Sequence, residues 1–423
     1  MQYLPELSII KLEEVEREQI PMRYQKPNLF VYRVAQAISW IAATLIFRLK
    51  VGRNDIKNKD GAFLVIANHQ CALDFVNLIG ATKRPMTFVL SKSFFSTLPI
   101  QGILKKMGII PKQQFQTTVA DMKKMKAVVE AGQPLVIYPA GLMCEDGLST
   151  PVPKATYKFL KWMNVDVYMA RTEGSYFVMP KWSKKLHPGR TDMDITLLFT
   201  KEELAALSLD EIRERTDAVL LYDAYRDQER HPYAYAACED IQGLENVLYM
   251  CPHCGSEHTV QVRDKSIIIC TACGFTETMD ARGFFHCEDK EKEIRYVSDW
   301  SKQIYEAMAK KLREDDSVRI QADVTFRMVD ETKHKMVDVG EGSVLLKRGS
   351  ITLTGTIRGR ETNLEVPIVG IPALPFSPGK HLEVQHGENI YRCVFKDGKP
   401  VMKFINMLKA FYCLEQAELA KAK

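Results

Sequence analysis

A histidine and an aspartate lie five positions apart in the stretch IANHQCALDF, residues 66–75. When a carboxylate holds one nitrogen of an imidazole ring, the other nitrogen is left to act as a base. His69 and Asp74 could therefore take the proton from a hydroxyl, which would then attack an acyl carbonyl. The structural alternative is a helix start with a buried histidine bound by its aspartate. Taken alone, the spacing favours that alternative, because such pairs arise often by chance.

The residues around this pair predict a strand that runs into a helix. GAFLVIANHQ is apolar and rich in β-formers, whereas CALDFVNLIG has the pattern of a helix start. His69 then stands at the carboxyl end of a strand, where sites in α/β sheets are usually built. Asp74 is expected about one turn into the helix, with its carboxylate turned back to the imidazole. Asn68 is expected to brace the turn.

The stretch NHQCALD resembles the NHxxxxD motif of the glycerophospholipid acyltransferases, the family that includes 1-acylglycerol-3-phosphate acyltransferase. That family continues with a basic residue, a proline and glycines, matched here by Lys92, Pro99, Gly102 and Gly108. Next comes a strand running into a Pro-x-Gly turn, matched by Tyr138, Pro139 and Gly141. A later strand and proline are matched by VYMARTEGSYFVMP. The resemblance covers about residues 30–228 and reverses the balance in favour of a catalytic pair.

The resemblance implies a mechanism. His69, oriented by Asp74, would deprotonate the hydroxyl of a lipid acceptor, which attacks the thioester of acyl-CoA or of an acyl carrier protein. The oxyanion would be stabilised by backbone N–H groups of the 138–142 turn or by Lys92. This chemistry requires no metal. The residues expected to contact substrate are Asn68, Lys92, Lys112, Tyr138, Gly141 and Arg171.

The chain departs from the family pattern where the family holds a phosphate. The usual Glu-Gly-Thr-Arg block reads Ala140, Gly141, Leu142 and Met143. The second block normally ends with an arginine, but Gln114 occupies the strict position and Lys112 lies nearby. An arginine grips phosphate through two parallel hydrogen bonds, whereas a lysine offers only a point charge.

Two interpretations of the acceptor follow from this departure. The first is an acceptor without a phosphomonoester, such as a glycolipid or a lipid with a neutral head. Alternatively, the lost arginine is replaced by Lys112, Lys92, Arg171 or the basic stretch KWSKKLHPGR. The loss of both charged positions favours the first interpretation.

Two CxxC pairs follow in CPHCGSEH and CTACGF, with 15 residues between them. A glycine follows each pair, so that each turn directs two thiolates at one centre. With a predicted hairpin between the pairs, the module resembles a zinc ribbon. We expect one structural Zn²⁺ per chain, held by Cys251, Cys254, Cys270 and Cys273.

The 423 residues are too many for one compact core, and an α/β class with additional domains is predicted. Alternating strands and helices predict an acyltransferase domain with a central mixed sheet flanked by helices. The last part has short strands and a final helix, which predicts a small β-sandwich or barrel of PH/GRAM-like type. The expected segments are a polar tail (1–28), the acyltransferase domain (29–228), a linker (229–245), the zinc ribbon (246–290), and the helix with the β domain (291–423).

The charge suits a membrane surface more than a nucleic acid. The net charge is +5 and the pI is about 8.5, too mild a bias for nucleic-acid binding. The apolar stretch at residues 34–47 would rise about 21 Å as a helix, short of the roughly 30 Å hydrocarbon layer. Both a buried core helix and a helix in the membrane interface remain open for it.

No secretory signal is expected in the first 28 residues, and the CxxC pairs indicate a reducing compartment. We therefore expect a cytoplasmic protein that is peripheral on the inner, anionic face of the membrane. The C-terminal half is expected to contact lipid or a protein partner. The alternative to an enzyme is a non-catalytic zinc-ribbon scaffold that binds lipid and recruits proteins.

Overall fold

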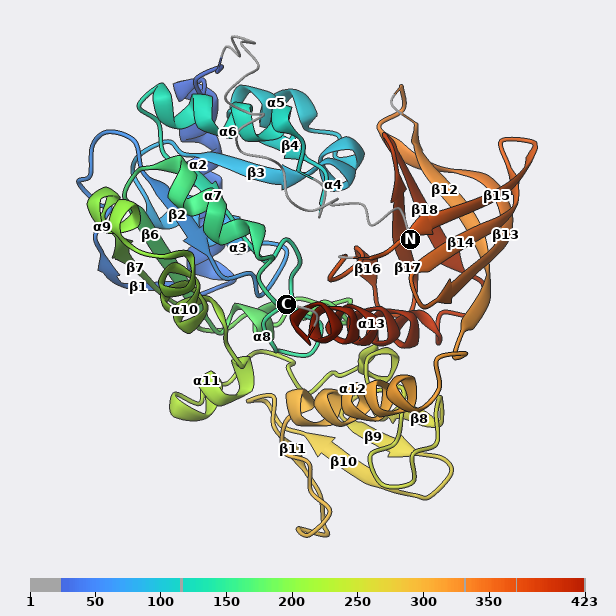
Figure 1. Ribbon diagram of the computed structural model, residues 1–423. Coiled ribbons are helices and arrows are strands. Elements are labelled where there is room, and N and C mark those ends of the chain that lie inside the picture. The colour runs from blue at the N-terminus through green and yellow to red at the C-terminus, as the bar shows by residue number, and fades with distance from the viewer. Residues whose placement is uncertain (1–23, 115–116, 331, 370, 422–423) are drawn as a thin grey trace. The chain divides into compact units, whose positions relative to one another are not determined.

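The computed structural model describes residues 24–114, 117–330, 332–369 and 371–421 (Figure 1). Most of the tail predicted for residues 1–28 lies outside them. The contacts divide the chain into two compact units that interleave along the sequence. Unit 1 holds the described residues up to Cys144, together with Leu148–Met179 and Pro188–His231. Unit 2 holds Glu145–Gly147, Pro180–His187 and the described residues from Pro232 onward.

Unit 1 is built on a seven-stranded sheet with the order β1-β7-β6-β2-β5-β3-β4. Strands β6, β2, β5, β3 and β4 are parallel, whereas β7 runs antiparallel to β6, and β1 is parallel to β7. The expected α/β fold with a central mixed sheet is therefore confirmed. The strands are β1 (Lys50–Asn54), β2 (Leu64–Ala67), β3 (Thr87–Ser91), β4 (Ile110–Lys112), β5 (Leu135–Ile137), β6 (Val167–Glu173) and β7 (Asp192–Phe199).

Helices cover both faces of this sheet, and alternate side chains of β2 enter two separate cores. Leu64 and Ile66 pack with α6, α7, α9 and α10, whereas Val65 and Ala67 pack with α2, α3 and α5. Capping boxes start α6, α9 and α10 at Thr118, Thr200 and Ser208. The helices are α2 (Leu29–Leu45), α3 (Asp74–Ala81), α4 (Lys92–Thr97), α5 (Gln101–Lys106), α6 (Val119–Glu130), α7 (Ala155–Met163), α8 (Ser175–Val178), α9 (Lys201–Ala206), α10 (Leu209–Leu220) and α11 (Ala224–Arg230).

Helix α2 packs on α3 through its small and polar side chains. A Cβ placed on Gly80 of α3 would lie 3.1 Å from the Ser39 carbonyl oxygen and 3.2 Å from the Ala43 Cβ, so a larger residue would push α2 outward by a few tenths of an ångström. Tyr32, Ser39 and Ala43 are the buried residues of α2. Among the described residues, no helix is both long and apolar enough to cross a membrane.

Unit 2 contains two antiparallel sheets. A four-stranded sheet, ordered β11-β10-β9-β8, follows the short 3₁₀ helix η1 (Leu244–Asn246) and precedes α12 (Val297–Glu314). Its strands are β8 (Val260–Arg263), β9 (Ile267–Cys270), β10 (Thr276–Met279) and β11 (Phe285–His286).

The second sheet of unit 2 has seven strands in the order β15-β14-β13-β12-β18-β17-β16. Gly342 and Gly355 face each other across β13 and β14, where a Cβ on Gly355 would meet the Glu341 carbonyl oxygen at 2.3 Å. The β domain and its final helix match the predicted element pattern, while its assignment to the PH/GRAM type stays a prediction. The elements are β12 (Ile320–Asp330), β13 (Lys335–Lys347), β14 (Ser350–Ile357), β15 (Arg360–Pro367), β16 (Phe376–Ser377), β17 (His381–His386), β18 (Asn389–Phe395) and α13 (Val401–Lys421).

Candidate active site

His69 and Asp74 meet at the carboxyl end of β2. His69 follows the strand by two residues, and its Nδ1 lies 2.9 Å from Oδ2 of Asp74. The Asp74 side chain is 1% exposed and the His69 side chain 21%. The sequence placed Asp74 a turn inside the helix, which is wrong, because Asp74 is the first residue of α3. The carboxylate therefore lies in the first turn of α3, at the positive end of the helix dipole.

Four further groups donate to the Asp74 carboxylate. The amides of Gln70 and Cys71 donate to Oδ2 over 2.6 and 2.9 Å. The Ser175 hydroxyl and the Cys71 thiol donate to Oδ1 over 2.7 and 3.4 Å. A buried carboxylate needs such partners, because an unpaired charge out of water is costly. The network fixes the carboxylate and, through Nδ1, the orientation of the imidazole ring.

Ser175 and Gln70 were not foreseen from the sequence. Ser175 starts α8 and lies 101 residues after Asp74, so no local pattern connects the two. The Gln70 side-chain oxygen accepts from the Tyr176 amide over 3.2 Å and lies 3.3 Å from the Ser175 hydroxyl. The turn between β6 and α8 thus holds both the carboxylate and the loop that carries His69.

Asn68 braces the site, although against β6 rather than within its own turn. Its amide group donates to the Thr172 carbonyl over 2.7 Å and accepts from the Thr172 N–H over 2.8 Å. Asn68 is 2% exposed. This two-way bond fastens the end of β2 to the end of β6.

The third block approaches the imidazole through Tyr138. The two ring centroids are 4.6 Å apart, with the planes inclined by 37°. Burial raises the pKa of Tyr138 well above its usual range, and the nearby Asp74 adds to the effect, so that the phenol stays neutral. Gly141 adopts φ 70°, a left-handed conformation that favours glycine, and its N–H donates to the Tyr138 carbonyl over 3.0 Å.

Gln114, at the strict position of the family's arginine, bonds to the same turn. Its amide nitrogen donates to the Gly141 carbonyl over 2.6 Å, and its oxygen accepts from the Ser91 hydroxyl over 3.3 Å. A neutral amide therefore joins the ends of β3 and β4 to the third block.

Comparison with known proteins decides what kind of domain carries this pair. A family model described as Acyltransferase matches residues 48–181 of the chain. We therefore refer to the part of unit 1 that carries this match as the acyltransferase domain. No curated protein matches the chain. Among solved structures, the chain is similar to the 1-acyl-sn-glycerophosphate (LPA) acyltransferase PlsC from Thermotoga maritima, with 18% identity and a TM-score of 0.40. The match covers 48% of this chain and 81% of that chain.

Lys92 and Lys112 lie on the same edge of the acyltransferase sheet as His69. Lys92 starts α4 directly after β3, and Lys112 ends β4 in register with Ser91. Two strands lie between β2 and β4, so Lys112 is roughly 14 Å across the sheet from β2. Burial lowers the pKa of Lys112 to about 8, although Asp121 partly offsets this shift. The Lys112 amine donates to the Gln113 carbonyl over 3.0 Å.

Arg171 is placed within β6 and bonds to protein groups. Its guanidinium donates to the Val219 and Leu221 carbonyls over 3.0 and 3.1 Å. It also donates to Asp227 over 2.8 Å. These bonds tie β6 to the segment between α10 and α11, which is the role of a structural arginine.

A small pocket opens beside the imidazole in the acyltransferase domain. The space between atoms there is ≈ 230 Å³ when the open solvent at its mouth is included. The Tyr222 hydroxyl at its wall donates to the His69 carbonyl over 2.9 Å. His69 and Tyr222 are the titratable side chains of the lining, which carries no lysine or arginine. The pocket is lined by Ala67, Asn68, His69, Ala140, Ser149, Thr150, Val152, Leu220 and Tyr222.

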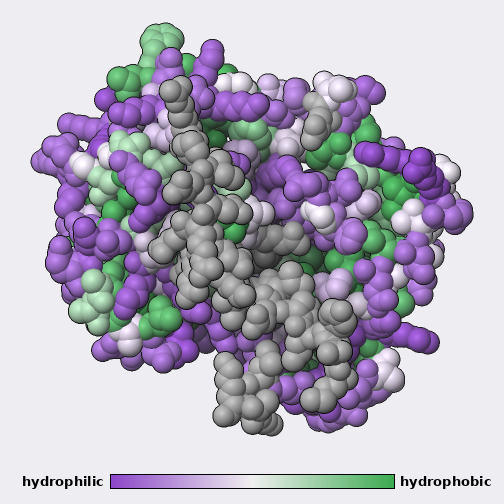
Figure 2. All heavy atoms as spheres, turned by 45° about the horizontal axis from the view of Figure 1, so that its top comes forward, coloured by the Kyte–Doolittle hydropathy of each residue, from purple (hydrophilic) through white to green (hydrophobic). Residues whose placement is uncertain are grey.

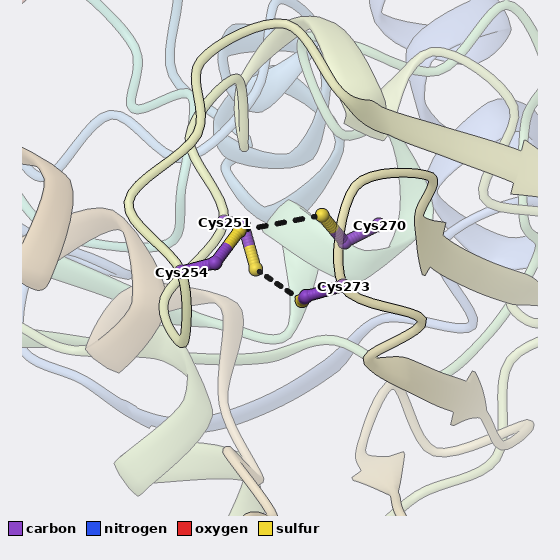
Figure 3. Close-up of side chains that lie close together, drawn as sticks. All are labelled: Cys251, Cys254, Cys270 and Cys273. Carbon is purple, nitrogen blue, oxygen red and sulfur yellow. Dashed lines mark hydrogen bonds between the residues drawn. The ribbon is translucent and has the colours of Figure 1, made fainter.

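The four predicted zinc ligands of unit 2 converge (Figure 3). All four sulfur atoms lie within 4.8 Å of one another. The Cys251–Cys273 and Cys254–Cys270 sulfur pairs are each 3.7 Å apart. A tetrahedral zinc with bonds of about 2.3 Å has sulfur–sulfur edges of about 3.8 Å, which matches these separations. The cluster is therefore compatible with a zinc site.

Left-handed glycines shape both cysteine turns. Gly255 and Gly274 have φ values of 69° and 77°. Their N–H groups donate to the carbonyls of Cys251 and Cys270 over 3.0 and 2.9 Å. Each turn thereby curls two thiols toward one point, as the sequence spacing indicated.

Proposed function

We propose that the acyltransferase domain moves a fatty acyl group from an acyl-CoA or acyl carrier protein thioester to a hydroxyl of a lipid acceptor. The observation that carries this proposal is the His69–Asp74 pair. Its carboxylate is buried and held by four donors besides the imidazole, and its imidazole borders a pocket. A carboxylate held only for structure would not need a partly exposed histidine beside an opening.

In this mechanism His69 acts as the general base. Asp74 holds the proton on Nδ1, so Nε2 accepts the proton of the acceptor hydroxyl. The resulting alkoxide forms a bond to the thioester carbonyl carbon and produces a tetrahedral oxyanion. The carbon–sulfur bond then breaks, and the imidazolium returns its proton to the leaving thiolate. The buried carboxylate stabilises the imidazolium during these steps.

The oxyanion requires hydrogen-bond donors on the same edge of the sheet. The Gly141 N–H already donates to the Tyr138 carbonyl. The proposed oxyanion donors are therefore Lys92 and the other amides of the 138–142 turn. Tyr138 packs against the ring of His69 and restricts its rotation.

The surroundings of His69 favour an acceptor without a phosphomonoester next to the reacting hydroxyl. The pocket lining lacks lysine and arginine, and the third block contributes Ala140. Gln114 is uncharged and donates to the Gly141 carbonyl, so it cannot neutralise a phosphate as an arginine would. A lysophospholipid remains the second possibility, with its phosphate at Lys92 and Lys112 two to three strands from β2. Lys112 is positively charged below about pH 8 and would serve that role there.

We also propose that the protein is peripheral on a membrane with anionic lipids and that α2 lies in the interface. Phe30, Val34, Ile38, Ile41 and Leu45 form an exposed stripe along α2, which we call the α2 stripe. Phe30 is 78% exposed and Leu45 68%. Figure 2 shows one face of the molecule, with hydrophobic side chains gathered at its upper left.

Helix α5 extends this apolar surface and adds positive charge. The Asn28 N–H donates to the Lys106 carbonyl, which fastens the start of α2 to the end of α5. Ile100 and Ile103 are exposed there, and Lys105 and Lys106 form the last turn of α5. Apolar side chains with a basic border suit the interface of a bilayer with anionic lipids.

The test of the enzyme proposal uses the purified full chain, palmitoyl-CoA, and acceptors with and without a phosphomonoester. We expect transfer by the wild type and a loss of at least about 100-fold in His69→Ala. The control is His231→Ala, which removes an exposed histidine of unit 1 outside the site. Unchanged turnover in folded His69→Ala would eliminate the dyad mechanism, whereas a wild type without any transfer would leave the scaffold alternative. The acceptor panel separates the two acceptor classes.

A further inference from the structure

Two segments that surround the dyad continue directly into unit 2. The first is the 138–144 turn, which contacts His69 through Tyr138 and ends at Cys144. The Cys144 thiol lies 3.8 Å from the Gln70 carbonyl and receives the Tyr222 hydroxyl at 3.2 Å. The second is the β6–α8 region, which supplies Ser175 and ends at Met179. Each segment becomes part of unit 2 at the next peptide bond.

Glu145–Gly147 is held within unit 2 by two helices. Glu145 is 3% exposed and forms an ion pair with Lys409 of α13. Asp146 is 7% exposed and accepts a 2.6 Å bond from the Ser301 hydroxyl of α12. Burial raises the pKa of Glu145, but Lys409 and Lys181 more than offset this, so the net shift is downward and the carboxylate stays charged.

Pro180–His187 is held in unit 2 in a similar way. The Lys181 amine lies 3.2 Å from the centroid of the Phe376 ring and acts electrostatically on Glu145. Lys185 forms an ion pair with Asp240. A Cβ on Gly243 would lie 2.4 Å from the Trp182 carbonyl oxygen, so the two backbones are in direct contact. Glu145 and Lys181 thus link the two held segments to each other.

The Glu145–Lys409 pair has the properties of a positional lock. A buried carboxylate that loses its cation is left uncompensated, which is strongly destabilising. Displacement of the Glu145–Gly147 segment is therefore opposed. Only one peptide bond separates Glu145 from Cys144, which contacts the carbonyl of Gln70. Movement of Glu145 would therefore move the end of the turn that packs against His69.

We propose that Lys409 is a positioning residue for the acyl transfer. Through Glu145 it holds the 138–144 turn where Tyr138 and the oxyanion donors meet His69. Unit 2 then contributes to the reaction through the two segments of the site whose chain continues into it. The inference rests on the acyltransferase activity proposed above and extends it by giving unit 2 a role in that activity.

The test compares two variants of the pair with a matched control. Lys409→Met and Glu145→Gln remove one charge each. Lys403 lies on the same helix, α13, and forms a partly exposed ion pair with Glu257, which Lys403→Met removes. We expect kcat to fall about 10- to 100-fold in the first two variants, because small displacements of reacting groups have such effects. We expect Lys403→Met to stay within about twofold of the wild type.

Two further measurements keep the result interpretable. Hydrogen–deuterium exchange of the full chain should become faster across residues 138–144 in Lys409→Met and unchanged in Lys403→Met. The charge-swapped double variant Glu145→Lys/Lys409→Glu should recover part of kcat. Folded Lys409→Met with wild-type kcat and wild-type exchange in the turn would overturn the proposal. If the wild type itself transfers no acyl group, the enzyme proposal fails, whereas the exchange data still decide whether the lock exists.

Discussion

At the scale of the residue, the Asp74 carboxylate is the centre of the site. It accepts from two backbone amides, a thiol and a hydroxyl while it holds the Nδ1 of His69. Three of these donors come from the neighbouring residues 70 and 71, and their positions follow from the turn before α3. Ser175 is different, because it comes from α8 and joins the dyad to β6. Together these donors fix the orientation of the buried carboxylate and satisfy its oxygens.

We expect Ser175→Ala to lower kcat about tenfold with little change in KM, because a hydrogen bond to a charged group is lost. Without this donor the carboxylate holds the imidazole less firmly, which affects the chemical step more than substrate binding. Steady-state kinetics measure kcat and KM separately.

Ser208→Ala is the control for this prediction. It also removes a serine hydroxyl bond, at the start of α10, and costs roughly 1 kcal/mol of stability without touching the dyad. Its kcat and its KM should equal those of the wild type. A Ser175→Ala enzyme with wild-type kcat would show that the hydroxyl is structural only.

At the scale of the element, α2 buries small and polar side chains and exposes large apolar ones, the opposite of most surface helices. Its buried side contains Tyr32, Ser39 and Ala43, while the larger aliphatic side chains of the α2 stripe point to solvent. Burying this stripe in water-free surroundings would contribute about 1.5–3 kcal/mol for each large side chain. Of the core and interface alternatives that the sequence left open, the exposure of the stripe favours the interface.

We expect Ile38→Glu to weaken binding to vesicles that contain phosphatidylglycerol by about 10- to 100-fold. The charge lies in the middle of the α2 stripe, where it would have to enter the acyl boundary. Co-sedimentation with vesicles measures the binding, and binding should also weaken at high salt, because the basic border is screened.

The control for this surface is Leu209→Glu. Leu209 is an exposed leucine at the start of α10, outside the α2 stripe, and a glutamate is favourable in the first turn of a helix. Vesicle binding of Leu209→Glu should equal that of the wild type. Equal binding by Ile38→Glu would remove α2 from the membrane surface.

At the scale of the whole molecule, the two units share the chain in an interleaved way. Within unit 2, the cysteine cluster is connected to α12, because the Trp300 indole donates to the Met250 carbonyl next to Cys251. The neighbouring Ser301 holds Asp146. A metal that orders the cysteine turns would therefore also support α12 and the segment at Glu145–Gly147.

We expect purified protein to contain about one zinc per chain, measured by elemental analysis. Cys251→Ser should lose the metal and lower the thermal midpoint, because the four-thiolate site is closed and structural. Cys287→Ser is the matched control, since this nearby cysteine lies outside the cluster and should leave the zinc content unchanged. A wild-type protein without bound metal would contradict the zinc assignment.

The dyad and the cysteine cluster were accessible from the sequence because each depends on short spacings. Four residues separate His69 from Asp74, and two residues separate the cysteines of each pair. The detailed position of Asp74 was missed, because a helix boundary depends on which amides the carboxylate captures. Gln114 was noticed as the residue in the place of an arginine, but its bond to Gly141 follows only from the fold.

The order of residues determined the sheet of unit 1, the turn that carries His69 and the four thiols, because alternation of apolar side chains and tight turns act over a few residues. The tertiary structure decided that Ser175 completes the carboxylate, that the α2 stripe is exposed, and that Glu145 meets Lys409 264 residues later. Such contacts form only when distant segments pack, and their stabilisation depends on burial that no local pattern encodes.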